Sequence, residues 1–153
     1  MSGLIQQVKK TIKEWKMLSR GETVIAAVSG GADSVVMLHL LLELSKEMGL
    51  RVIVAHMDHG LRGRESTRAP AFVRGLARSL GLEFTSARLE KGALKGAGGS
   101  AQAAARLRRY AFLEETVAKY KAQRVALGHT ADDQAETVIM RLLKGSSLSG
   151  LSG

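Results

Sequence analysis

The 153-residue sequence contains no cysteine, one proline and few aromatic residues. The absence of cysteine excludes disulfides, thiolate nucleophiles, iron–sulfur clusters and cysteine-based zinc sites. Aromatic residues make up 4% of the chain, so its core must be aliphatic. No apolar run approaches the roughly 18 residues that a membrane span needs, and the polar N-terminus lacks the apolar segment of a signal peptide. These absences favour a cytoplasmic globular domain that does not contact a membrane.

The positive charge is unevenly placed along the chain. Lysine and arginine outnumber acidic residues by 23 to 14, a net charge of +9. Residues 59–131 contain 14 basic and 5 acidic residues, whereas the charges of the remaining segments balance. An excess confined to one half of the chain indicates a polyanionic partner such as nucleic acid. A basic surface that serves only solubility is the alternative interpretation.

Apolar stretches of two kinds alternate along the chain. Short runs rich in β-branched residues predict strands buried on both faces, and apolar residues three or four apart predict helices. The predicted strands cover residues 23–28, 51–56, 82–87 and 124–128, and the predicted helices cover 4–18, 34–48, 67–80, 100–120 and 131–144. This alternation predicts an α/β fold, a Rossmann-like parallel sheet flanked by helices, in a single domain over residues 1–153.

Helical spacing also predicts which side chains face the core. Trp15 continues the apolar face of the first helix, and the inner face of the helix that Ser100 caps carries Ala104, Leu107, Ala111 and Phe112. Pro70 is compatible with its helix only in the first turn, where its missing N–H group is not needed.

A strand–loop–helix junction, Ser29-Gly30-Gly31-Ala32-Asp33-Ser34, is the first chemical signal. Two glycines let the backbone approach a ligand closely, and the following helix directs free N–H groups at it, which suits an anion. Asp33 would repel a phosphate unless a hard cation such as Mg²⁺ lies between them. The junction therefore predicts a phosphate site, although a simple capped helix start is the alternative. It is not a Walker A loop, because the lysine of that motif is missing.

Three carboxylates follow the last predicted strand. Asp132, Asp133 and Glu136 are spaced so that all can border one face of a helix, where together they would attract a metal ion or an amine. Asp133 is the first candidate, because a capping position three residues after Thr130 keeps it at the end of the strand. An acidic first turn favoured by the helix dipole is the alternative.

Three segments carry a resemblance to known families. SGGADS at residues 29–34 resembles the SGGxDS loop of the PP-loop ATP pyrophosphatase superfamily, whose members attack the α-phosphate of ATP. Together with it, AHMDHGLR at 55–62 and LGHTADDQAET at 127–137 resemble the tRNA(Ile)-lysidine synthetases closely. The chain departs from that family at Gln102 and Ala103, where two glutamates are common.

The resemblance implies an activity. Members of that family use ATP to ligate free lysine to the wobble cytidine of tRNA(Ile) with a CAU anticodon, through an adenylated cytidine. The family carries further domains, so this chain is expected to be the N-terminal catalytic part of a longer protein, either a monomer or a homodimer. The missing cysteines argue against the related tRNA thiolases, which carry sulfur or a cluster on cysteine. A PP-loop ligase or amidotransferase acting on a small molecule, and a non-enzymatic nucleic-acid binder, remain as alternatives.

The resemblance also implies roles for individual residues. ATP contacts are expected from the loop residues and from His56, Met57 and Arg106, and Mg²⁺ ligation from Asp33 and Asp133. The expected catalytic residues are Asp33, His129, Asp133 and Glu136. The other two arginines of the same helix, Arg108 and Arg109, are expected to face tRNA or solvent. The roles of Asp132, His59 and Gln102 stay open.

Overall fold

The computed structural model describes residues 2–58, 63–89, 100–130 and 138–144. One five-stranded sheet runs through it in the order β3-β2-β1-β4-β5. The strands are β1 (Thr23–Ala27), β2 (Arg51–Asp58), β3 (Glu83–Arg88), β4 (Arg124–Thr130) and β5 (Val138–Lys144). The first four are parallel and β5 is antiparallel to β4. The expected parallel sheet is confirmed.

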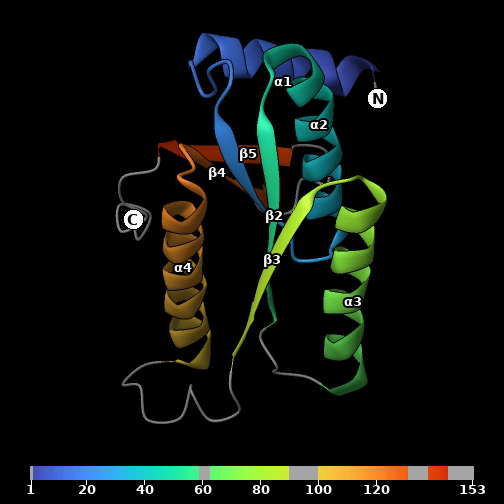
Figure 1. Ribbon diagram of the computed structural model, residues 1–153, viewed down its shortest axis with the longest axis vertical. Helices are drawn as coiled ribbons and strands as arrows, with labels where there is room; N and C mark the ends of the chain where they lie inside the picture. Colours follow the sequence, from blue (N-terminus) through green and yellow to red (C-terminus); the bar gives the residue numbers. More distant parts are fainter. Residues whose placement is uncertain (1, 59–62, 90–99, 131–137, 145–153) are drawn as a thin grey trace.

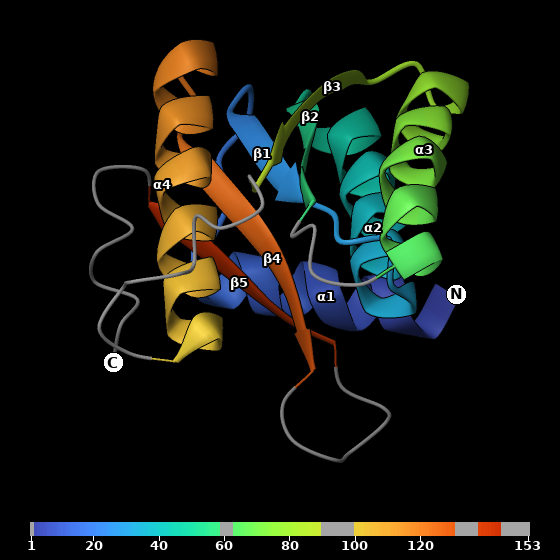
Figure 2. The same ribbon diagram turned by 90° about the horizontal axis from the view of Figure 1, so that it is seen from below.

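Helices cover both faces of the sheet. They are α1 (Ser2–Glu14), α2 (Ala32–Met48), α3 (Gly63–Ser79) and α4 (Ala101–Tyr120). In Figures 1 and 2, α2 and α3 lie on one face and α4 on the other, while α1 crosses the end where the parallel strands begin. The ligand-binding edge of such a sheet is the opposite one, at the carboxyl ends of the strands.

The core has two halves, one on each face of the sheet. Val24 and Ala26 of β1 pack in the half that contains α1, α2 and α3, whereas Ile25, between them, packs in the half beneath α4. All three side chains have no exposed surface. A strand whose two faces are both covered needs apolar residues at every position, which is why the uninterrupted apolar runs predicted the central strands.

The last predicted helix is wrong over Val138–Lys144, which form β5. This strand pairs with β4 along its whole length, from Arg124 opposite Lys144 to Thr130 opposite Val138. Without β5, the backbone N–H and C=O groups on that side of β4 would be an open edge. The segment is rich in apolar and β-branched residues, and pairing with this edge outweighs its helical spacing.

Three smaller expectations are wrong as well. α3 begins at Gly63, so Pro70 lies inside the helix rather than in its first turn. α1 ends at Glu14, so Trp15 leaves the apolar face and its side chain is 72% exposed. In α4, Leu107 and Ala111 are exposed and Ala104 is half-buried, whereas Phe112 is buried as expected, together with Ala105, Leu113 and Thr116. The inner face of α4 is therefore rotated by about one residue from the expected face.

The cap of α4 is confirmed. The side chain of Ser100 accepts a hydrogen bond from the backbone N–H of Ala103 at 3.2 Å, which satisfies one of the free donors of the first turn.

Candidate functional site

The strand order creates a crevice beside β1. From β1 the chain passes to β2 and β3 on one side, and it returns through α4 to β4 on the other side (Figure 2). Connections that leave in opposite directions open a gap at the carboxyl ends of the two central strands, where ligands of α/β sheets bind. Ser29, two residues after the end of β1, and Gly128, within the last three residues of β4, both lie at this gap.

The backbone of the loop after β1 requires glycine at Gly30. Its φ of +95° lies in a region that other residues rarely adopt. A Cβ atom there would also lie 3.4 Å from a methyl group of Val73 and 3.6 Å from the Cβ of Ala69, both in α3. Gly30 thus allows both the turn and the close packing of the loop on α3.

Two serine hydroxyls hold the loop closed. The Ser34 hydroxyl donates to the carbonyl of Gly31 at 2.9 Å and accepts from the backbone N–H of Ser29 at 3.2 Å. The Ser29 hydroxyl lies 3.2 Å from that of Ser34 and accepts from the N–H of Gly31 at 3.3 Å. Their first role is therefore to fix the shape of the loop, and this was not predicted from the sequence.

The N-terminus of α2 presents backbone donors at the same place. Gly31 is the N-cap and offers no side chain, while its carbonyl accepts the first helical bond from Val35 at 3.1 Å. The amides of Ala32, Asp33 and Ser34 precede the first residue that can bond within the helix, so they are available to an anion. The Asp33 side chain is exposed in this first turn.

Gly128 lets the end of β4 approach α2. A Cβ atom at this position would lie 3.0 Å from Cα and 3.2 Å from the backbone N of Ser34. Sequence reasoning missed this residue, although a glycine that ends an apolar strand was the available signal.

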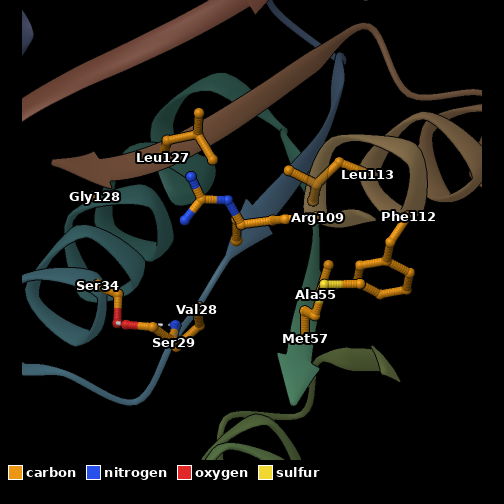
Figure 3. Close-up of a pocket in the computed structure, with 11 residues that line it drawn as sticks. Val28, Ser29, Ser34, Ala55, Met57, Arg109, Phe112, Leu113, Leu127 and Gly128 are labelled. Carbon is orange, nitrogen blue, oxygen red and sulfur yellow. Dashed lines mark hydrogen bonds between the residues drawn. The ribbon is translucent and has the colours of Figure 1, made fainter. Parts of the chain in front are cut away.

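These elements border an open pocket with a cavity volume of about 140 Å³ on the α4 side of the sheet (Figure 3). It is bordered by strands β1, β2 and β4, by the glycine loop after β1, and by α4. The lining residues are Ala27, Val28, Ser29, Ser34, Ala55, Met57, Arg109, Phe112, Leu113, Leu127 and Gly128. The pocket therefore joins an apolar wall to the loop hydroxyls and one cationic side chain.

Arg109 is that cationic side chain, and the expectation that it faces away is wrong. Its guanidinium extends from α4 into the space between Leu127 and the loop serines (Figure 3). Its Nε is buried without a hydrogen-bond partner, its guanidinium carbon lies 5.5 Å from the centre of the Tyr110 ring, and no carboxylate in the described part of the chain forms an ion pair with it. A buried cation without a counter-charge is costly unless an anionic ligand completes it. The sequence signal was its spacing of three and four from the buried Phe112 and Leu113.

The other three residues that were expected to contact ATP lie in three different environments. Met57 lines the pocket. Arg106 is exposed, with its guanidinium 5.5 Å from the centre of the Tyr110 ring, and it does not line the pocket in the described structure. His56 is buried, and its Nδ1 lies 2.8 Å from the carbonyl oxygen of Val28.

Several candidate residues lie outside the described part of the structure. They are His59, Asp132, Asp133 and Glu136, together with the side chains of Gln102 and His129. Among the described residues there is no group of three or more potential metal ligands, and no helix is long and apolar enough to cross a membrane.

Comparison with known proteins shows close relatives. The chain is 45% identical over 150 residues to a protein from Symbiobacterium thermophilum, 44% over 151 residues to one from Dehalococcoides mccartyi, and 43% over 150 residues to one from Bacillus cereus. Each relative is named tRNA(Ile)-lysidine synthase, and each match covers 97–98% of this chain. The chain spans about a third of the relatives, 31–32% of their length.

Solved structures share the fold at low sequence identity. One is the U34-tRNA thiolase NcsA from Methanococcus maripaludis with its [4Fe-4S] cluster, at a TM-score of 0.72 and 20% identity over 86% of this chain and 48% of that one. Another is an NH3-dependent NAD synthetase from Campylobacter jejuni, at a TM-score of 0.54 and 17% identity over 81% and 52%. A family model described as "PP-loop domain" matches residues 2–153 of this chain. The chain therefore belongs to the PP-loop domain family, and we call its glycine loop at residues 29–34 the PP-loop.

Proposed function

We propose that the chain is the catalytic domain of a tRNA(Ile)-lysidine synthetase and the N-terminal part of a longer enzyme. It binds ATP, adenylates the wobble cytidine of tRNA(Ile) with a CAU anticodon, and ligates free lysine to that base. The single structural observation that carries ATP binding is the buried Nε of Arg109, which has no hydrogen-bond partner among the described residues and shares a pocket with the PP-loop. The tRNA substrate is inferred from the names of relatives that are 41–45% identical. A tRNA substrate also supports a cytoplasmic location.

The pocket offers a separate surface to each part of ATP. The amides of Ala32 and Asp33 and the loop backbone bind the β- and γ-phosphates, because a helix N-terminus stabilises negative charge. Arg109 donates to the α-phosphate, where charge develops when the phosphorus is attacked. Met57 and Phe112, on the apolar wall, leave room for the adenosine.

Asp33 fits a role beside Mg²⁺. It is an exposed carboxylate at the edge of an otherwise anion-binding loop. Protein-bound Mg²⁺ keeps several waters and needs one or two carboxylates besides phosphate oxygens. When bound, the ion neutralises the phosphates during displacement of pyrophosphate. Asp133 is the second proposed ligand.

The chemistry proceeds in two displacements. The cytidine O2 attacks the α-phosphorus of ATP, and the bond to the β-phosphate breaks with release of pyrophosphate. The ε-amine of lysine then attacks C2 of the adenylated base, and the C2–O2 bond breaks with release of AMP. The amine must lose a proton, for which we propose Asp133 and Glu136 as the carboxylates that bind and deprotonate it. We propose that His129 orients the base or its phosphate.

Exposed arginines beside the pocket fit a nucleic-acid partner. Arg106 and Arg108 lie on α4, the helix that carries Arg109 into the pocket, and both are exposed. Cations in this position neutralise RNA phosphates while the target base reaches the pocket. ATP contact by Arg106 therefore becomes secondary to that of Arg109 in this proposal.

A domain replacement tests the proposal. Residues 1–153 of this chain replace the matching N-terminal third of the Dehalococcoides mccartyi relative, and tRNA(Ile) is incubated with ATP and lysine. Mass spectrometry should find lysine added at the wobble cytidine, and a tRNA with uridine at that position should gain nothing. Pyrophosphate release that is independent of tRNA would favour a small-molecule ligase instead. The isolated chain should bind ATP but ligate lysine poorly, because few of its surfaces can hold a tRNA.

A further inference from the structure

We propose that His56 is a positioning residue that holds the PP-loop from behind the sheet and does not touch the nucleotide. This inference rests on the proposed ATP site. His56 is 2% exposed, and its Nδ1 lies 2.8 Å from the carbonyl oxygen of Val28, the last residue before the loop. Because a carbonyl only accepts hydrogen bonds, Nδ1 carries the hydrogen of this bond.

The alternation of side chains along β2 places His56 away from the pocket. Val54 packs in the core half that contains α2 and α3, whereas Ala55 packs in the half beneath α4. Since successive side chains of a strand point to opposite faces, His56 follows Val54 and Met57 follows Ala55. Met57 lines the pocket on the α4 side, and His56 does not. A direct contact between His56 and the nucleotide is therefore disfavoured.

The bond to Val28 lies where the pairing of β1 with β2 stops. The N–H of Val28 donates to the carbonyl of Ala55 at 2.9 Å, as in a parallel ladder. If the ladder continued, the carbonyl of Val28 would accept from the next β2 amide. The donor described for this carbonyl is instead the His56 ring. The histidine thus replaces a ladder bond at the point where the loop leaves the sheet.

One peptide group is consequently held at both ends. The carbonyl of Val28 and the N–H of Ser29 belong to the same rigid plane. The oxygen accepts from His56 at 2.8 Å, and the N–H donates to the Ser34 hydroxyl at 3.2 Å. A plane fixed on both sides cannot rotate, so the chain enters Gly30 in one orientation, with its φ at +95°. The loop amides are then preset for phosphate before ATP arrives.

The second ring nitrogen of His56, Nε2, allows a positioning role to be distinguished from direct contact with ATP. Nε2 of His56 is buried and has no hydrogen-bond partner among the described residues. A histidine that contacted ATP directly would use this nitrogen, whereas a positioning histidine uses Nδ1. The amide nitrogen of asparagine reaches roughly the place of Nδ1, and that of glutamine the place of Nε2. Two substitutions at one buried position therefore separate the two roles.

The experiment compares His56→Asn and His56→Gln with His39→Asn, a control on the partly buried histidine of α2. ATP affinity is measured by calorimetry with Mg²⁺, and the unfolding midpoint is recorded for each variant. We expect His56→Asn to stay within about threefold of the unsubstituted chain and His56→Gln to lose about tenfold, the effect of one hydrogen bond. Both should lower the midpoint similarly, because both bury an amide, and the control should leave affinity unchanged.

Hydrogen exchange of the Ser29 amide gives a readout without nucleotide. Exchange should accelerate in His56→Gln and stay slow in His56→Asn. The reverse order of ATP affinities would show direct contact through Nε2 and overturn the inference. Equal affinities and equal exchange in the two variants would reduce His56 to packing and also overturn it. An unsubstituted chain that does not bind ATP would refute the proposed function, while the exchange rates would still decide the role of His56.

Discussion

Two arginines of this chain are withdrawn from solvent, and their surroundings differ. Arg124, at the start of β4, forms an ion pair with Glu22 at 3.1 Å and donates to the carbonyl of Met17 at 2.9 Å and to that of Gln123 at 3.3 Å. Arg109, near the far end of the same sheet, has a buried Nε without a partner among the described residues. A satisfied cation is part of the fold, whereas an unsatisfied one indicates where a ligand binds.

The two ends of the sheet therefore have different roles. At the amino end, Arg124 ties the linker between α1 and β1 to β4, and Lys9 pairs with Glu47 between α1 and α2. At the carboxyl end, Arg88 pairs with Asp58 at 3.6 Å where β3 and β2 end, whereas beside β1 the backbone approaches closely at Gly30 and Gly128 and donors remain available. Stability is built where charges are paired, and binding is expected where they are not. Substitutions at either end can test this contrast.

The largest expected effect is on stability at the amino end. Arg124→Met should lower the free energy of unfolding by about 3–5 kcal/mol, because it leaves the nearly buried Glu22 carboxylate without its partner. Urea denaturation measures this change. ATP affinity of the folded fraction should be unchanged. The matched double variant Arg124→Met with Glu22→Gln should recover part of the loss, and a failure to recover any would contradict the pairing argument.

The next effect concerns binding at the carboxyl end. Arg109→Met should weaken ATP binding by about 30- to 150-fold, the loss of roughly 2–3 kcal/mol from a hydrogen bond to a charged phosphate. Its unfolding free energy should stay equal or rise, since no paired charge is lost. Isothermal titration calorimetry measures the ATP affinity, and urea denaturation measures the free energy of unfolding. Unchanged ATP affinity in a folded variant would remove Arg109 from the site.

A smaller effect is expected where β4 meets α2. Gly128→Ala should lower the free energy of unfolding by about 1–3 kcal/mol, because its methyl group would overlap the backbone of Ser34 and push the helix N-terminus outward. ATP affinity should fall in the same variant. Gly75→Ala in α3, where a Cβ meets no atom within 4 Å, is the matched control and should raise stability slightly. Equal behaviour of both variants would argue against a close approach.

The smallest effect concerns the surface beside the pocket. Arg108→Gln should reduce the slope of the logarithm of tRNA affinity against the logarithm of salt concentration by about 0.9, the contribution of one duplex phosphate contact. ATP affinity should not change, because Arg108 is exposed and outside the pocket lining. Filter binding at several salt concentrations, with the domain-replaced enzyme, gives the slope. An unaltered slope would place the tRNA elsewhere.

Local patterns predicted much of this fold. The central strands follow from uninterrupted apolar runs, and the cap at Ser100 follows from one side chain and the helix after it. The PP-loop follows from adjacent glycines between a strand and a helix. Each of these features depends on residues near one another in the sequence, so its physical cause can be identified without tertiary contacts.

The sequence-based predictions are wrong where contacts with a distant segment determine the local structure. Val138–Lys144 forms a strand because β4 has an open edge to pair with, although its spacing also suits a helix. Arg109 was assigned to tRNA or solvent because Arg106 was taken as the arginine of α4 that faces the nucleotide, and Leu107, also expected on the inner face, is 70% exposed. The spacing of Arg109 from Phe112 and Leu113 places it on the buried face of α4. The sequence of this alanine-rich helix is compatible with several buried faces, however, so the spacing alone did not identify the right one.

The sequence by itself determined the α/β alternation and the position of the glycine loop between β1 and α2. These depend on backbone preferences and hydrophobic periodicity, which act over a few residues. Only the tertiary structure decided that Arg109 shares the pocket with the loop and that Gly128 approaches Ser34. It also decided that His56 holds Val28 from the other face. Those relations join strands and helices far apart in the chain, and they follow from how the sheet orders its strands.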